Sequence, residues 1–381
     1  MASSKKEANE KGRDKAVAAL KAAILKKTKL KTIRLSELAQ DGCFSSGMDL
    51  FDLPCGGGVP YGGITMIWGE SQTAKTGVAL ALAGEFQREE PEGVVVVVDM
   101  ENAMSGPFAR LVGADDERIL VPEGIQTAEE AFQICATAME TYTKLLGRKK
   151  VMIVWDSWAS SLPKEDREKG FDTPRLGSLA RCGSQYWKNI RGIVRSTGSV
   201  MVVTNQARCK IGVTFGETTG PPGGKALYFN SDLVIKNRVS EKLKRKGMED
   251  PIGVEIEFVV KKSRQCPPFR KGRYRIFFLS GKVNDHECWK WMLERYNLAS
   301  ASNGVKVQGI DDKIGSSIAE FHREIGQNKE LRDYLCGLLH TAMFTDTGEE
   351  VEAEAIVDGE DTELKALLGM EEEIQDEVEE V

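Results

Sequence analysis

Residues 64–76 read Ile64-Thr65-Met66-Ile67-Trp68-Gly69-Glu70-Ser71-Gln72-Thr73-Ala74-Lys75-Thr76. The first five residues have the composition of a short buried strand, and residues 77–90 place their apolar side chains at helical spacing. Between them lies a polar segment that starts at Gly69 and ends with Lys75 and Thr76. The stretch therefore predicts a strand, a tight turn and a helix in direct succession.

This succession is typical of a P-loop, which binds the phosphates of a nucleotide. Backbone N–H groups at a helix N-terminus point outward, and the helix dipole favours an anion there. Lys75 would contact the β- and γ-phosphates, and the Thr76 hydroxyl would hold Mg²⁺. We therefore predict a phosphate site made of Gly69, Glu70, Ser71, Gln72, Thr73, Ala74, Lys75, Thr76 and Gly77.

Ala74 departs from the strict pattern G-x-x-x-x-G-K-[ST], which has its second glycine at this position. A Cβ atom there costs little free energy if φ is negative and more if φ is positive. The loosened pattern is also common by chance. The alternative is an ordinary strand-to-helix turn, so the rest of the chain has to decide.

Composition narrows the possible classes of protein. A chain of 381 residues predicts two to three domains with a sizeable core. The eight cysteines are scattered without a C-x-x-C pair, which argues against zinc ribbons and disulfide frameworks and for a reducing, cytoplasmic compartment. The three histidines all lie in the last quarter, which argues against histidine-based catalysis at the loop. No signal peptide opens the chain, and apolar runs such as Val94–Val98 are far too short to span a membrane.

The charge is distributed unevenly. The net charge is −6, but residues 346–381 hold 16 acidic side chains and one lysine, which leaves about +9 for the preceding part of the chain. A basic body with an acidic tail predicts nucleic-acid binding, with the tail either regulating that binding or keeping the protein soluble.

The amino-terminal segment reads as a separate arm. Apolar residues among the lysines and arginines of residues 5–27 predict an amphipathic helix, and residues 30–35 alternate like a half-buried strand. We expect residues 1–36 to dock on a neighbouring subunit. The alternative is an arm that folds back on its own core.

Three further buried strands are predicted, and each ends in polar residues. They are Val94–Val98, Val151–Trp155 and Val200–Thr204, separated by helices over residues 127–146 and 177–196. Alternating strands and helices predict an α/β fold, with a mostly parallel sheet covered by helices on both faces. The polar strand ends would then meet at the edge where nucleotides bind.

The polar residues at this edge have the chemistry that nucleotide hydrolysis needs. Asp156 has the position of a Walker B carboxylate, which acts on Mg²⁺ through its waters. Glu101 could orient and deprotonate the attacking water, and Gln206 could sense the γ-phosphate. For each acid, the alternative is a helix N-cap.

These residues carry a resemblance to the bacterial and phage RecA recombinase family. The quoted motifs are Asp99-Met100-Glu101-Asn102-Ala103, Trp155-Asp156-Ser157, Asn205-Gln206-Ala207-Arg208-Cys209-Lys210-Ile211-Gly212-Val213-Thr214-Phe215-Gly216, Gly223-Gly224-Lys225-Ala226-Leu227-Tyr228-Phe229 and Val259-Val260-Lys261-Lys262. The similarity runs from about residue 30 to 285 and is loose over residues 285–345. Whether the source is a phage or a bacterium stays open.

The resemblance implies a RecA-like P-loop NTPase core with a twisted, mostly parallel sheet. The expected parts are an arm (1–36), the ATPase core (37–284), a small α-rich domain (285–345) and an acidic tail (346–381). Two DNA-binding loops are expected, at about 164–176 and 207–222.

The family also implies roles for individual residues. ATP and Mg²⁺ would bind at the predicted loop, with Thr76 and Asp156 near the metal, Glu101 as general base and Phe108 against the adenine. Gln206 would couple the γ-phosphate to the second DNA loop. Cations reaching the ATP of the adjacent subunit would be Lys261, with Lys262 or Arg264. Ser105 replaces an acid near the adenine, and the chain is one residue longer around Lys261–Arg264, so the second cation is not decided.

The two loops combine cations with exposed apolar side chains, which suits a stretched DNA strand. The alternative is a pair of solvated surface loops. The predicted DNA-binding residues are Arg175, Leu176, Arg181, Arg208, Lys210, Ile211, Gly212, Phe215, Gly223, Gly224 and Lys225.

Together these features predict an ATP-dependent recombinase. It would form a helical homo-oligomeric filament on single-stranded DNA and exchange strands with duplex DNA in recombination and repair. The acidic tail could recruit single-strand-binding or loading proteins. One alternative is a hexameric RecA-type helicase motor. Another is a DNA-binding filament scaffold that binds ATP through the Ala74 loop but hydrolyses it weakly.

Overall fold

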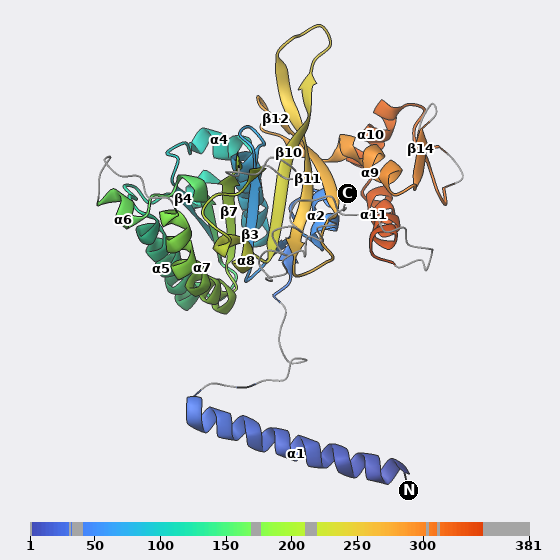
Figure 1. Cartoon of the computed structure of the whole chain (residues 1–381). Coiled ribbons are helices and arrows are strands. Elements are labelled where there is room, and N and C mark those ends of the chain that lie inside the picture. Colours follow the sequence, from blue (N-terminus) through green and yellow to red (C-terminus); the bar gives the residue numbers. More distant parts are fainter. Residues whose placement is uncertain are drawn as a thin grey trace, which may run out of the picture. The chain divides into compact units, whose positions relative to one another are not determined.

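The computed structural model describes residues 2–29, 32, 41–168, 177–209, 219–301, 305–310 and 313–345. The chain divides into two compact units, residues 1–42 and 43–381 (Figure 1). In the described part of the chain, no helix is long and apolar enough to cross a membrane.

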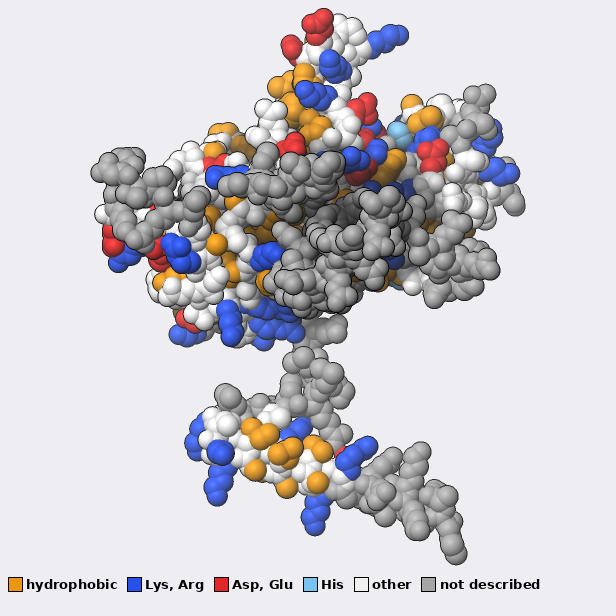
Figure 2. Space-filling model, in the orientation of Figure 1, with side chains coloured by type: hydrophobic (Ala, Val, Ile, Leu, Met, Phe, Trp, Pro, Cys, Tyr) orange, Lys and Arg blue, Asp and Glu red, His pale blue; other side chains and the backbone are white. Residues whose placement is uncertain are grey.

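The first unit contains one long helix, α1 (Ala2–Thr28), as predicted, but over its whole length the apolar and polar residues do not separate into two faces, so the predicted amphipathic character is not found. Leu20 is 60% exposed and Leu25 is 48% exposed. Hydrophobic side chains gather on the visible face of α1 between lysines and arginines (Figure 2). The strand predicted over residues 30–35 lies outside the described residues, apart from Thr32.

The second unit is built on a nine-stranded sheet with the order β13-β12-β11-β10-β3-β7-β6-β4-β5. Strands β10 through β5 in that order are parallel, and β11, β12 and β13 add to β10 in antiparallel fashion. The strands are β3 (Ile64–Gly69), β4 (Val94–Asp99), β5 (Ile119–Leu120), β6 (Val151–Asp156), β7 (Val200–Gln206), β10 (Leu233–Lys244), β11 (Pro251–Ser263), β12 (Lys271–Phe277) and β13 (Val283–Asn284). The predicted α/β fold with a mostly parallel sheet is confirmed, whereas the antiparallel extension was not foreseen.

Helices cover both faces of the sheet because its central strands are apolar on both sides. One core joins Val95 and Val97 to α3 (Lys75–Glu89). The other joins Val96 and Val98 to α5 (Ala128–Leu146) and α7 (Ser178–Thr197). Successive residues of one strand therefore serve opposite layers.

Short elements connect this framework. They are β1 (Cys43–Phe44), α2 (Asp49–Cys55), β2 (Val59–Pro60), α4 (Gly106–Leu111), α6 (Lys164–Arg167), β8 (Arg208–Cys209), β9 (Thr219–Gly220) and α8 (Ala226–Asn230), with 3-10 turns at Asp116–Arg118, Trp158–Ser160 and His286–Cys288. Strands β10 and β11 extend past the rest of the sheet as a projecting hairpin (Figure 1).

The carboxy-terminal region has its own small core. It contains α9 (Trp289–Arg295), β14 (Ala299–Ala301), β15 (Val305–Val307), α10 (Ile318–Gln327) and α11 (Lys329–Phe344). Its buried side chains pack together with Leu50 of α2. The predicted acidic tail, residues 346–381, lies outside the described residues.

Candidate nucleotide and DNA site

Steric contacts at the end of β3 explain why a glycine stands at position 69. A Cβ atom on Gly69 would clash with the Asn237 carbonyl oxygen and come within 2.8 Å of Thr73 Oγ1. The Asn237 side chain in turn donates to the Thr73 carbonyl oxygen at 3.2 Å. Asn237 lies on β10 and carries no motif, so sequence reasoning did not find it. The turn after Gly69 is therefore held closely against β10.

Ala74 has left-handed backbone geometry, with φ 57° and ψ 22°. The strict pattern has glycine here because glycine adopts positive φ without steric cost. The sequence left the sign of φ at Ala74 open. The structure shows that φ is positive, the conformation that is unfavourable for a residue with a Cβ atom. Ala74 is also the N-cap of α3 and makes no side-chain capping hydrogen bond.

Lys75 opens α3 and turns back over the loop. Its Nζ donates to the Glu70 carbonyl oxygen at 2.6 Å. Burial lowers the pKa of the Lys75 ammonium, while the nearby carboxylates of Asp156 and Glu101 act in the opposite direction. The ammonium and the first N–H groups of a 15-residue helix thus face the same anion site.

Asp156 ends β6 and is held by hydroxyl groups from two other elements. Thr76 Oγ1 donates to Asp156 Oδ2 at 2.6 Å, and Thr204 of β7 donates to Oδ1. Burial raises the pKa of Asp156, and these two hydrogen bonds counteract that rise. Thr204 had not been singled out because a threonine inside a strand gives no local signal of its partner.

Glu101 lies at the end of β4 within a set of donors. Its Oε1 accepts from Ser157 Oγ at 2.6 Å, Gln206 Nε2 at 2.9 Å and Ser160 Oγ at 3.1 Å. The two serines were not predicted. Residues that follow or end three strands therefore meet at one carboxylate oxygen. These contacts fix the position of Glu101 relative to the phosphate loop.

A cleft of about 720 Å³ joins these groups. It contains the predicted residues Ser71–Gly77, Glu101, Phe108, Asp156 and Gln206. Its other wall comes from β10, from the antiparallel strands β11 and β12 and from the turn after β12, and was not foreseen: Val239, Lys242, Pro251, Val254, Ile276, Phe277, Phe278 and Gly281. A cleft that combines phosphate-binding groups with apolar side chains suits a nucleotide.

The donor atoms also suit the expected cofactors. ATP would place its phosphates at the N-terminus of α3, beside Lys75. The Thr76 hydroxyl and the Asp156 carboxylate are oxygen ligands of the kind that Mg²⁺ prefers, directly or through water. Ser105 caps α4, because its hydroxyl accepts from the Phe108 N–H at 3.3 Å. The residue that departs from the family pattern thus helps to position Phe108 at the cleft.

Lys261, Lys262 and Arg264 are not among the residues that line this cleft. Lys262 Nζ donates to the Tyr228 and Phe229 carbonyl oxygens at 2.8 and 2.9 Å, and Arg264 pairs with Asp232. Burial, followed by the charge of Arg264, lowers the pKa of Lys262 to about 8. A β-bulge lies at Lys261, because Val234 pairs with Lys262 and Ile235 with Val260.

The second predicted DNA loop starts directly after the nucleotide site. Arg208 follows Gln206 by two residues and pairs with Gly220 in the small β8–β9 ladder. Asn205 Nδ2 donates to the Pro222 carbonyl oxygen at 3.1 Å and so joins the two ends of the loop. Lys210, Ile211, Gly212 and Phe215 lie outside the described residues.

Only some of the other predicted DNA-binding residues lie in the part of the chain that the structure describes. Arg181 pairs with Glu165 at 2.7 Å, whereas Arg175 and Leu176 lie outside the described residues. A Cβ on Gly223 would clash with the Trp158 indole, and one on Gly224 would come within 2.7 Å of Ala180 Cβ. Lys225 is the N-cap of α8. The two glycines therefore serve close packing at the base of the loop.

Comparison with known proteins agrees with the family resemblance found in the sequence. Residues 16–283 match the family described as the RecA N-terminal domain. The chain is 30% identical to "Protein RecA" of Thermus aquaticus over 282 residues, which is 73% of this chain and 76% of that protein. It is 29% identical to "Protein RecA" of Aquifex aeolicus over 312 residues, or 82% and 81% of the two chains. A similar match, 30% over 298 residues, covers 78% of this chain and 70% of "Protein RecA" of Leptospira biflexa.

Proposed function

Because this chain belongs to the RecA family, we propose that it is an ATP-dependent DNA recombinase acting in the cytoplasm. It forms a helical filament on single-stranded DNA and exchanges strands with a homologous duplex. ATP binding holds the active filament, and hydrolysis releases it.

One contact supports this proposal most directly. Gln206 Nε2 donates to Glu101 at 2.9 Å, and the β8–β9 ladder of the DNA loop starts two residues later. Glu101 lines the same cleft as Lys75 and Asp156. A change at the γ-phosphate end of the cleft therefore has a short covalent path to the DNA loop.

The chemistry follows from the positions of the side chains. The N-terminus of α3 and Lys75 bind the phosphates, and Thr76 and Asp156 hold Mg²⁺, which would neutralise phosphate charge when bound. Glu101 takes a proton from the attacking water, and the donors around its Oε1 orient the carboxylate for this step. Lys261, with Lys262 or Arg264, completes the ATP site of the adjacent subunit.

The surface chemistry supports assembly. The α1 leucines at positions 20 and 25 are exposed. Strand β5 is an edge of the large sheet; its Leu120 is 55% exposed, and Val121, the residue after the strand, is 45% exposed. An arm from another copy would cover such an edge, because exposed leucines and an unpaired strand edge favour association.

Electron micrographs of the protein with ATP and single-stranded DNA test the proposal. We expect helical filaments, together with an ATPase rate that single-stranded DNA increases. Closed rings would support a hexameric motor instead. Filaments whose ATPase does not respond to DNA would support a weakly hydrolysing scaffold.

A further inference from the structure

The β10–β11 hairpin changes its register beside the nucleotide cleft. Val239 pairs with Ile256, but the next pair along the hairpin is Glu241 with Glu255, so Ser240 is an extra residue on β10. Such a β-bulge shifts all following side chains to the opposite face of the strand. Lys242 therefore lies opposite Val254, and both residues line the cleft. Without the bulge, Glu241 would occupy this place.

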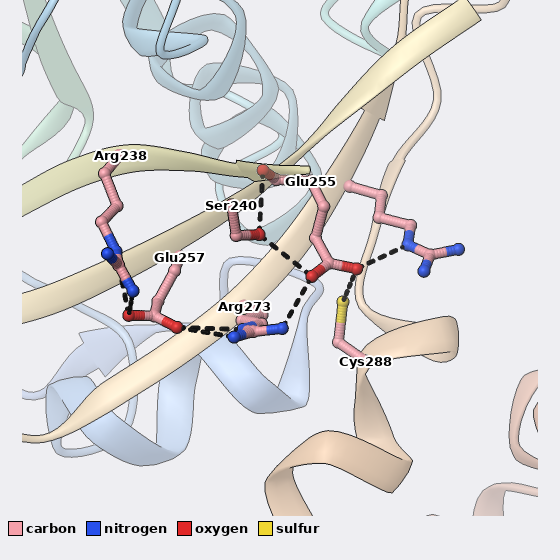
Figure 3. A network of polar contacts seen from close by, with 7 residues as sticks. Arg238, Ser240, Glu255, Glu257, Arg273 and Cys288 are labelled. Atoms are coloured by element: carbon pink, nitrogen blue, oxygen red, sulfur yellow. Dashed lines mark hydrogen bonds and ion pairs between the residues drawn. The ribbon is translucent and has the colours of Figure 1, made fainter. Parts of the chain in front are cut away.

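A partly buried polar network holds the bulge in position (Figure 3). The Ser240 hydroxyl lies 3.0 Å from Glu255 Oε1 and 3.2 Å from the Glu255 carbonyl oxygen. The Glu255 carboxylate, only 4% exposed, is bound by Arg273 and Arg275 of β12, each at 3.0 Å. Because two arginines fix its carboxylate, Glu255 is a rigid acceptor for Ser240.

The Lys242 side chain has the properties of a ligand contact. It is exposed at the cleft, and no described residue forms an ion pair with it. The projecting hairpin carries further lysines and arginines (Figure 2), but Lys242 is the one of these that lines the cleft. A lysine ammonium has three hydrogen-bond donors and no acceptor, so its partner must offer acceptor atoms.

Strand spacing indicates which end of a nucleotide Lys242 meets. Asn237 pairs with Gly69, where the phosphate loop begins, and also with Phe258 of β11. Val254, the partner of Lys242, lies four residues from Phe258 along β11, a distance of about 13 Å. Val254 in turn pairs with Ile276 of β12. A Cβ on Gly77 would come within 2.7 Å of Ile276 and 3.7 Å of Phe108, the residue that the family resemblance places against the adenine, so Lys242 belongs to the rung of the sheet next to the expected base. The apolar residues Ile276 and Phe277 line the same cleft.

We infer that Lys242, turned into the cleft by the bulge at Ser240, is a specificity-determining contact that donates hydrogen bonds to the base or ribose of the bound nucleotide. This inference rests on the proposed nucleotide function. It adds a cation at the nucleoside end of the cleft, separate from Lys75 at the phosphate end.

The test compares two probes on the full-length protein, ADP and inorganic tripolyphosphate. Lys242→Met keeps the length of the side chain and removes the donors, so ADP should bind about three- to tenfold more weakly. Tripolyphosphate should bind as it does to the parent, because it has no nucleoside. Lys246→Met, a change at the hairpin tip, is the matched control and should leave both affinities unchanged.

A second pair of variants tests the bulge itself. Deleting Ser240 should place Glu241 opposite Val254 and weaken ADP binding at least as much as Lys242→Met does. Adding Glu241→Lys to the deletion should restore a lysine in the cleft and recover the affinity. If the deletion prevents folding, Lys242→Met still decides the matter.

The outcomes separate this inference from the proposed function. Unchanged ADP affinity in Lys242→Met would overturn the inference and leave the proposed function intact. An equal loss for ADP and tripolyphosphate would make Lys242 a phosphate contact and overturn the nucleoside assignment. A parent protein that binds neither probe would contradict the proposed function itself.

Discussion

Replacing Ala74 by glycine should stabilise the protein, although glycine usually destabilises a helix end. Ala74 has φ 57° and ψ 22°, a left-handed conformation that costs an L-residue about 1–2 kcal/mol. Glycine removes that cost but adds about 0.5–1 kcal/mol of backbone entropy in the unfolded chain. The net gain in the free energy of unfolding should be about 0.5–1 kcal/mol. For a unit of this size it corresponds to a rise in Tm of roughly 1–2 °C.

Thermal unfolding followed by tryptophan fluorescence measures this effect in the core. Trp155, Trp158 and Trp187 are fully buried and contact one another, so their emission reports loss of the core. The matched control is Ala136→Gly in the interior of α5, where φ is not positive. This second change should lower stability by about 1 kcal/mol.

Each of the two substitutions thus removes one methyl group, but the expected changes in the free energy of unfolding have opposite signs. A loss of stability in Ala74→Gly similar to that of Ala136→Gly would refute the argument from positive φ. ADP affinity should change little in Ala74→Gly, because glycine adopts the same left-handed conformation and keeps the loop N–H groups in place.

Four further predictions concern chemistry, assembly, regulation and pH. Glu101→Gln should lower the rate of ATP hydrolysis by about 10²-fold or more while ATP binding and filaments persist, because only the base is lost. Lys75→Ala should instead lose nucleotide affinity. A parental rate of hydrolysis in Glu101→Gln would show that Glu101 is not the base. Deleting residues 1–34 should give monomers with a folded core; undiminished polymers in light scattering would contradict the role of the arm. Cutting after Phe344 removes the tail with its net charge of −15 and should tighten binding to duplex DNA at low salt. The gain in affinity should be smaller at ~0.15 M salt, where charges more than about 8 Å apart are screened. Equal affinities of the full-length and the truncated protein in titrations at low salt would leave the tail a role in solubility only. Burial raises the pKa of Asp285 to about 7, so its protonated form is favoured in the folded state and stability should fall as pH rises from about 4 to about 7; Asp285→Asn should flatten this part of the pH–stability profile in urea titrations.

Local sequence was enough to predict the framework of the nucleotide site. Strand, turn and helix around Gly69 and Lys75 follow from residue type and spacing, which act over a few neighbours. The polar ends of β4, β6 and β7 could be placed together because parallel strands align their carboxyl ends at one edge. The family motifs then predicted which of these residues act on ATP.

Contacts between distant segments had no such local signal. Thr204 on Asp156, Ser157 on Glu101 and Asn237 on the phosphate loop join residues that are far apart in the chain or separated by turns. A serine or threonine in a strand looks the same whether it contacts a carboxylate or water. Only the packing of the sheet brings these partners together.

Strand register is the clearest case. The sequence by itself predicted the strand, turn and helix that begin the phosphate loop at Gly69, but it assigned no role to Lys242. Only the tertiary structure decided that Ser240 is an extra residue and that Lys242, rather than Glu241, faces the cleft. The physical reason is that side chains alternate with a period of two, so one unpaired residue reverses every face beyond it. Which residue is left unpaired depends on the partner strand and on the ion pairs around Glu255, not on the strand itself.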